Sequence, residues 1–168
     1  YLGGVTLNAD NITVNNVVSK DGNLSFFNSS GSEKMRITAG GNVGIGTTPV
    51  GFHSSYTGLQ VGGTATWFSD TTRAAGVASL FTQNAHIDTD ASWEYIVTDE
   101  ASYYAQVGGK HTFYTAVSGT AGNDITFGDA KVTILNGGNV GIGTTLPTSA
   151  LDVVGTINAT AVRTGMLN

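Results

Sequence analysis

A nine-residue segment occurs twice in this chain of 168 residues. Residues 40–48 and residues 137–145 both read Gly-Gly-Asn-Val-Gly-Ile-Gly-Thr-Thr, and the similarity continues on both sides of each copy. A repeat of this length indicates a duplicated structural unit. The first copy carries a short insertion around Phe52–Tyr56. The flanking segments that correspond are Lys34–Ile37 with Lys131–Ile134, and Leu59–Thr64 with Leu151–Thr156.

Each copy has the pattern of two short strands joined by a glycine turn. Met35 and Ile37 alternate with polar residues, as in a strand with one buried face. The segment Gly40-Gly41-Asn42 then supplies residues that adopt positive φ in a tight turn. We therefore predict a strand, a turn and a second strand in each copy.

The second strand of each copy carries a glycine between two β-branched residues. Val43 and Ile45 point to one side of this strand, whereas Gly44 lies on the other. Glycine weakens a strand unless another backbone approaches it closely. We therefore expect neighbouring chains or windings to pack against the glycine face. The equivalent residues of the second copy are Val140, Gly141 and Ile142.

The composition predicts an all-β protein and excludes several other classes. The chain contains 24 Thr, 24 Gly, 16 Val and 9 Ile, whereas charged residues make up 11% of it. So few charged residues exclude a coiled coil or helix bundle, and a net charge of −5 without a basic patch excludes a nucleic-acid binder. The apolar runs are too short to insert into a membrane. The absence of Cys excludes disulfides and Cys-ligated metal sites.

The stretch between the two copies differs from them, because it holds both Trp residues and most of the acidic residues. Short strand-like runs and turn clusters predict a small β-sandwich or barrel-like module here. The runs are Thr66–Phe68, Ala78–Gln83, Trp93–Val97, Tyr103–Val107, His111–Ala116 and Asp124–Phe127, with turns at Asp88–Asp90, Asp99-Glu100 and Gly108-Gly109. The chain thus divides into an N-terminal strand segment (1–20), a first repeat (21–64), a central module (65–129) and a second repeat (130–168).

The repeat resembles one found in bacteriophage tail fibres and tailspikes. The unit Gly-Asn-Val-Gly-Ile-Gly-Thr-Thr, followed by Pro147 and then by Leu151–Ile157, is similar to repeats that precede self-cleaving intramolecular chaperones in such proteins. The runs Trp93-Glu94-Tyr95 and His111–Ala116 resemble a β-rich module found between these repeats in fibre-like phage proteins. We therefore expect the sequence to be a segment of a longer fibre polypeptide.

The resemblance implies an elongated homotrimeric β-fibre with glycine-rich repeats on both sides of the central module. It also implies a virion appendage that is assembled in the host cytoplasm and contacts other virion proteins. A physical argument agrees, because open strand edges need a cover and a threefold assembly provides one. We assign turn formation and packing between the three chains to Gly41, Val43, Gly44, Ile45, Gly46, Gly138, Val140, Gly141, Ile142 and Gly143.

No residue pattern predicts catalysis, a cofactor or a metal ion. His86, Asp88 and Asp90 have the spacing of metal ligands, but without a second cluster they are expected to form an exposed acidic loop. The acidic residues of the central module show no pair placed to flank a sugar, as glycoside hydrolysis requires. The glycine loop at 141–146 lacks the following helix that a dinucleotide site needs. We expect a protein without enzymatic activity.

The aromatic residues of the central module allow two interpretations. Trp93 and Tyr95 lie two residues apart, on one face of a strand, which suits a buried core. Alternatively, Trp67, Trp93, Tyr95, Tyr103 and Tyr104 form a platform for stacking on sugars, because aromatic side chains offer a large, rigid contact area. In that case Tyr103 and Tyr104 are the candidates for contact with a host receptor or glycan. The expected function is structural, as a segment that extends a phage fibre. The alternatives are a carbohydrate- or receptor-binding module of the fibre and a bacterial surface adhesin with the same repeat.

Overall fold

The computed structural model describes residue 19 and residues 22–161. These residues form thirteen β-strands and no helix, which confirms the predicted all-β fold. The predicted N-terminal segment 1–20 lies outside the described residues, except for residue 19. Within the described part of the chain, no helix is long and apolar enough to cross a membrane.

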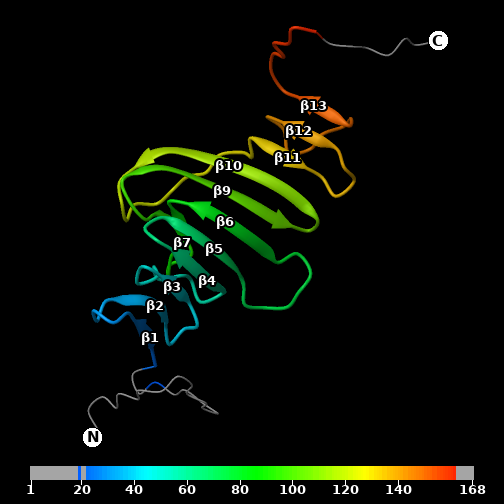
Figure 1. Cartoon of the computed structure of the whole chain (residues 1–168). Coiled ribbons are helices and arrows are strands. Elements are labelled where there is room, and N and C mark those ends of the chain that lie inside the picture. Colours follow the sequence, from blue (N-terminus) through cyan, green and yellow to red (C-terminus); the bar gives the residue numbers. More distant parts are fainter. Residues whose placement is uncertain (1–18, 20–21, 162–168) are drawn as a thin grey trace, which may run out of the picture.

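Eleven strands form one large sheet, and two short strands form a second sheet (Figure 1). The large sheet contains β1 (Leu24–Phe27), β2 (Glu33–Ile37), β3 (Val43–Ile45), β4 (Tyr56–Val61), β5 (Ala65–Asp70), β6 (Ala78–Gln83), β9 (Asp99–Val107), β10 (Lys110–Gly119), β11 (Val132–Ile134), β12 (Val140–Ile142) and β13 (Leu151–Val153). The small sheet contains β7 (Ala85–Ile87) and β8 (Trp93–Tyr95). Strand order in the large sheet follows the chain, and neighbours are antiparallel except in the parallel pairs β3–β4 and β12–β13.

The two copies of the repeat have corresponding hydrogen bonds. The Thr38 N–H donates to the Asn42 carbonyl at 2.8 Å in the first hairpin, and the Leu135 N–H donates to the Asn139 carbonyl at 2.8 Å in the second. In each copy the hairpin is followed by a strand that pairs in parallel, β4 in the first and β13 in the second. The sequence duplication therefore corresponds to one local strand arrangement used twice.

The strands of the central module belong to the same sheet as the repeats. β5, β6, β9 and β10 pair with one another and connect β4 to β11. β7 and β8 pack on one face of this sheet and form part of a second layer. The predicted strand at 124–127 is wrong, because these residues contribute a single bridge between Asp124 and Glu94. The predicted turn Asp99-Glu100 instead begins β9, and β7 was not predicted.

The buried core lies on one face of the large sheet. One cluster consists of Phe52, Phe68, Leu80, Ile87 and Ala105, and a second consists of Ala85, Tyr95, Ala101 and Ile125. Phe52 comes from the insertion of the first repeat. Its ring fills the space above Gly58, where an added Cβ would lie 2.5 Å from the ring. The insertion and the small sheet thus cover this face over the central strands.

Candidate assembly surface

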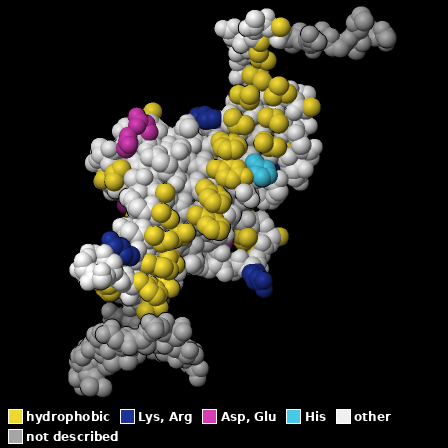
Figure 2. All heavy atoms as spheres, viewed as in Figure 1, with side chains coloured by type: hydrophobic (Ala, Val, Ile, Leu, Met, Phe, Trp, Pro, Cys, Tyr) yellow, Lys and Arg dark blue, Asp and Glu magenta, His cyan; other side chains and the backbone are white. Residues whose placement is uncertain are grey.

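The opposite face of the large sheet carries one apolar or aromatic residue in register on every strand. Strand pairing places these residues side by side in a continuous line, which we call the apolar row. None of them is buried within the single chain. Figure 2 shows hydrophobic side chains in a band that crosses the molecule. The apolar row consists of Leu24, Ile37, Val43, Leu59, Trp67, Phe81, Tyr104, Phe113, Val132, Ile142 and Val153.

Four aromatic residues at the centre of the apolar row form a ridge. The Trp67 and Phe81 rings stack with centroids 5.2 Å apart and planes 7° apart. Centroids lie 6.0 Å apart between Phe81 and Tyr104, and 4.9 Å apart between Tyr104 and Phe113. Trp67, Phe81 and Phe113 remain 49%, 41% and 43% exposed. We call these four residues the aromatic ridge.

A hollow lies on each side of the aromatic ridge. The first, which we call the apolar hollow, has a volume of about 360 Å³; its exposed lining is mostly apolar. The second, the polar hollow, has a volume of about 290 Å³ and exposes polar and apolar surface in similar amounts. Beside the ridge residues, the apolar hollow is lined by Gln83, Ser102 and Thr115. The polar hollow is lined by Ser69, Ser79, Gln106, Lys110 and His111 together with the turn at 107–109.

Hydrogen bonds hold the polar border of the ridge in place. The Trp67 indole N–H donates to the Ser79 hydroxyl at 3.0 Å, and the Tyr104 hydroxyl is bonded to Nδ1 of His111. From β3 to β13, no Asp, Glu, Lys or Arg occupies a paired strand position on this face. A surface of this kind is removed from water without burying an ionised side chain, which would cost free energy.

The predicted packing residues lie on both faces of the sheet. Val43, Ile45, Val140 and Ile142 lie on the face of the apolar row, where Ile45 and Ile142 are 42% and 44% exposed. Their role in packing between chains stays a prediction. The four flanking glycines adopt positive φ at equivalent places in the two copies: Gly41 (+84°), Gly46 (+71°), Gly138 (+91°) and Gly143 (+72°).

Gly44 and Gly141 lie on the face opposite the apolar row, and both are buried. A Cβ added to Gly44 would collide with the Thr47 carbonyl oxygen and would lie 2.7 Å from Cδ of Pro49. At Gly141 it would collide with the Thr144 carbonyl oxygen. The expected close approach of another backbone is therefore made by a loop of the same chain.

Tyr103 and Tyr104 point to opposite faces of β9, so they do not form one binding platform. Tyr103 stacks between Trp93 and Tyr114, with centroid distances of 4.5 Å and 4.3 Å. Burial, together with Tyr114, raises the pKa of Tyr103 well above its ordinary value. Tyr104 belongs to the aromatic ridge. Receptor contact by either residue stays a prediction.

Sequence analysis missed Phe81 and Phe113, which lie between and beside Trp67 and Tyr104 on this surface. Each of them alternates with a residue on the covered face, such as Phe68 next to Trp67. The alternation within each strand was visible in the sequence. Which residues of neighbouring strands lie side by side depends on the pairing register of the strands, which the sequence does not show.

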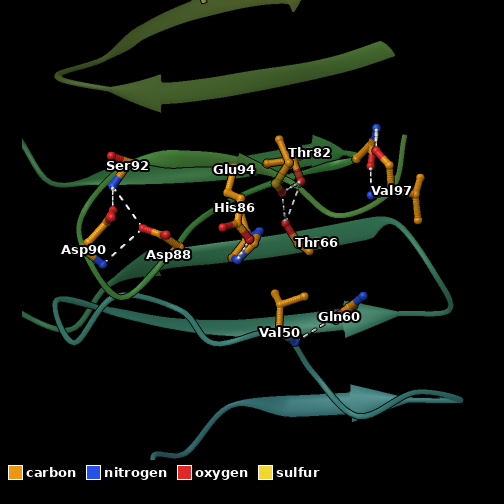
Figure 3. Close-up of polar contacts among 12 residues, drawn as sticks. Val50, Gln60, Thr66, Thr82, His86, Asp88, Asp90, Ser92, Glu94 and Val97 are labelled. Atoms are coloured by element: carbon orange, nitrogen blue, oxygen red, sulfur yellow. Dashed lines mark hydrogen bonds and ion pairs between the residues drawn. The ribbon is translucent and has the colours of Figure 1, made fainter. Parts of the chain in front are cut away.

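Three acidic residues of the central module lie close together in the chain: Asp88 and Asp90 in the turn between β7 and β8, and Glu94 on β8 (Figure 3). The Asp88 and Asp90 carboxylates accept hydrogen bonds from backbone N–H groups of the turn between β7 and β8. His86 is buried, and its Nε2 lies 3.6 Å from Oε1 of Glu94. Among the described residues, no group of three or more His, Asp or Glu side chains is arranged to hold a metal ion.

The buried imidazole of His86 predicts a loss of stability in mild acid. Burial lowers the pKa of His86 below its ordinary value of 6.5, and Nδ1 finds no hydrogen-bond partner among the described residues. The unfolded chain then takes up this proton before the folded chain does, so the free energy of unfolding falls as the pH drops below 6.5. Burial raises the pKa of Glu94, and this group adds stability as it becomes protonated in acid.

We expect the midpoint of thermal unfolding to fall between about pH 7 and about pH 5.5, and to fall less in His86→Gln. His53→Gln is the matched control, because His53 lies outside the contact between His86 and Glu94 and should keep the wild-type slope. Circular dichroism at several pH values measures all three proteins. Equal slopes for wild type and His86→Gln would contradict the assignment.

No known protein family matches the sequence, and no curated protein does either.

Proposed function

We propose that the chain is a structural segment of a homotrimeric virion fibre, in which three copies pack their apolar rows around a common axis. The observation that carries this proposal is the continuity of the apolar row across all eleven strands, with no member buried in one chain. The sequence resemblance to phage tail fibres and tailspikes supports the same assembly. The segment would extend and stiffen the appendage and would contact other virion proteins.

The dimensions of the sheet support an assembly of several chains. β3, β11, β12 and β13 have three residues each. Such short strands cannot bury the side chains of the apolar row without a further layer. With strands spaced by about 4.8 Å, the row extends about 48 Å from β1 to β13 before twist is considered. Three such rows would form the long apolar core of a fibre.

The aromatic ridge supplies a large driving force for association. If each aromatic side chain presents about 200 Å², the exposed fractions of Trp67, Phe81 and Phe113 leave about 270 Å² uncovered per chain. At about 25 cal/mol per Å², burying this area favours association by about 7 kcal/mol per chain. The loss of translational and rotational freedom on association opposes this gain.

Light scattering tests the assembly directly. We expect a mass of three times 17.2 kDa and a trimer that resists unheated detergent. Phe113→Glu should yield monomers, because association would bury an unpaired carboxylate in the ridge. Leu146→Glu is the control: Leu146 is 77% exposed in the loop after β12, and this variant should remain trimeric. A folded monomer of the wild-type chain would overturn the proposal.

A carbohydrate-binding module of the fibre is the second candidate, favoured by the position of the aromatic ridge beside the polar hollow. A sugar can place its apolar face on aromatic rings while its hydroxyl groups bond polar side chains. This use requires an accessible ridge, so a monomeric wild-type chain whose glycan-array binding is lost in Phe113→Glu would favour it. Virion proteomics separates both candidates from a bacterial surface adhesin.

A further inference from the structure

The two hollows that flank Phe81, Tyr104 and Phe113 differ in chemistry, which makes this part of the assembly face asymmetric. A third hollow, of about 230 Å³, lies farther along the row beside Leu59 and Trp67. The apolar hollow is walled by the rings of Phe81, Tyr104 and Phe113, and little polar surface is exposed in it. The polar hollow is lined by Ser79, Gln106 and His111, and much of the surface exposed in it is polar. Filling the apolar hollow with an aromatic side chain removes little polar surface from water. Filling the polar hollow in this way would bury polar groups without hydrogen-bond partners.

We infer that the aromatic ridge of each copy packs into the apolar hollow of the next copy around the ring, while the polar hollow stays on the outside. This inference rests on the proposed trimer and specifies how its chains meet. The contact joins two different patches, the ridge of one copy and the hollow of its neighbour. A contact of this type generates a closed ring when the rotation between copies is one third of a turn.

The alternative is that the three ridges meet one another on the axis. That packing would leave the apolar hollow of about 360 Å³ without a partner in every chain. Protein interiors are close-packed, and unfilled space forfeits dispersion contacts. Packing the ridge into the hollow fills this space and covers the exposed rings at the same time.

The axis of the ring runs along the apolar row, so each strand faces the same strand of the neighbouring copies. Three residues of β6 point to this face: Ser79 beside the polar hollow, Phe81 in the ridge and Gln83 beside the apolar hollow. The inferred packing brings Phe81 of one copy next to Gln83 of the next copy and keeps it away from Ser79. On β10, Phe113 lies in the ridge, Thr115 lies beside the apolar hollow and His111 lies beside the polar hollow.

Disulfide trapping tests this arrangement, because the natural chain has no Cys. Each test chain carries a single Cys, so every disulfide joins two chains. The three substitutions are Phe81→Cys, Gln83→Cys and Ser79→Cys. Pairs of variants are refolded together, oxidised and separated in detergent without reductant. We expect a covalent dimer from Phe81→Cys mixed with Gln83→Cys. We expect none from Phe81→Cys alone or from its mixture with Ser79→Cys.

The other outcomes overturn the inference in distinguishable ways. A dimer from Phe81→Cys alone would show that the ridges meet on the axis, and a dimer only with Ser79→Cys would place the ridge in the polar hollow. If light scattering gives a trimer in either case, the packing is wrong and the proposed function stands. A monomeric wild-type chain would overturn both the inferred packing and the proposed function. If Phe81→Cys fails to assemble, Phe113→Cys with Thr115→Cys or His111→Cys gives the same comparison on β10.

Discussion

Replacing Gly44 by Ala is expected to lower the free energy of unfolding by about 3 kcal/mol, because the added methyl group has no space. Its Cβ would collide with the Thr47 carbonyl oxygen and would lie 2.7 Å from Cδ and 3.0 Å from the nitrogen of Pro49. Two of these three atoms belong to the backbone, so the loop itself must move. Chemical denaturation of wild type and variant measures the difference.

The matched control is Gly40→Ala, in the turn four residues earlier. The atoms nearest to a Cβ at Gly40 are 3.9 Å and 4.0 Å away, so this substitution should change stability little. The second copy offers the same pair: Gly141→Ala should be destabilising, and Gly137→Ala, which has no atom within 4 Å, should not. If both variants of a pair changed the free energy of unfolding by the same amount, the close approach of the loop would not be the reason for glycine at these strand positions.

Replacing Asn84 by Ala is expected to lower the free energy of unfolding by about 4 kcal/mol. Asn84 is fully buried between β6 and β7 and adopts φ of +58°. Its side-chain amide donates to the carbonyls of Val97 at 3.0 Å and Glu100 at 2.9 Å, and its carbonyl accepts from the Val97 N–H at 2.7 Å. Ala leaves these backbone groups without their partner and tolerates the left-handed conformation less well than Asn.

Asn84→Gly separates the two contributions. Gly tolerates the positive φ but loses all the side-chain hydrogen bonds, so its stability should lie between those of wild type and Asn84→Ala. Asn158→Ala, on an exposed residue near the end of the described chain, should have little effect. Thermal and denaturant unfolding of the four proteins measures the order. A loss in Asn84→Ala no larger than that in Asn158→Ala would contradict the role of the buried amide.

Both of these positions show a limit of sequence reasoning. The glycine between two β-branched residues was a visible signal, and it correctly indicated a close backbone approach. The identity of the approaching backbone was not visible, because the path of the loop at Thr47–Pro49 depends on the parallel pairing of β3 with β4, which the sequence of the loop does not show. For Asn84 there was no signal, since its partners Val97 and Glu100 lie in a distant part of the chain.

Local strand formation was predictable because it depends on near neighbours in the chain. The run Ala78–Gln83 is β6 as predicted, and the predicted turn at Gly108-Gly109 joins β9 to β10. The failure at 124–127 has the opposite cause. Ile125 is buried, and its N–H donates to the Trp93 carbonyl at 2.6 Å without a continuing strand pair. An alternating pattern therefore indicates that alternate residues are buried. A loop can bury alternate residues without forming a strand.

The sequence by itself determined the all-β class, the duplicated hairpin and the residues that share a face within each strand. It did not determine which face of the sheet is covered, because both faces of the central strands carry large apolar residues: Trp67 is followed by Phe68, and Phe81 follows Leu80. The tertiary structure decided this, since the small sheet and Phe52 cover the face of Phe68 and Leu80. The opposite face, which carries the aromatic ridge, therefore remains exposed. Which face is covered depends on contacts between segments far apart in the chain, whereas the periodicity of a strand shows only which of its residues share a face.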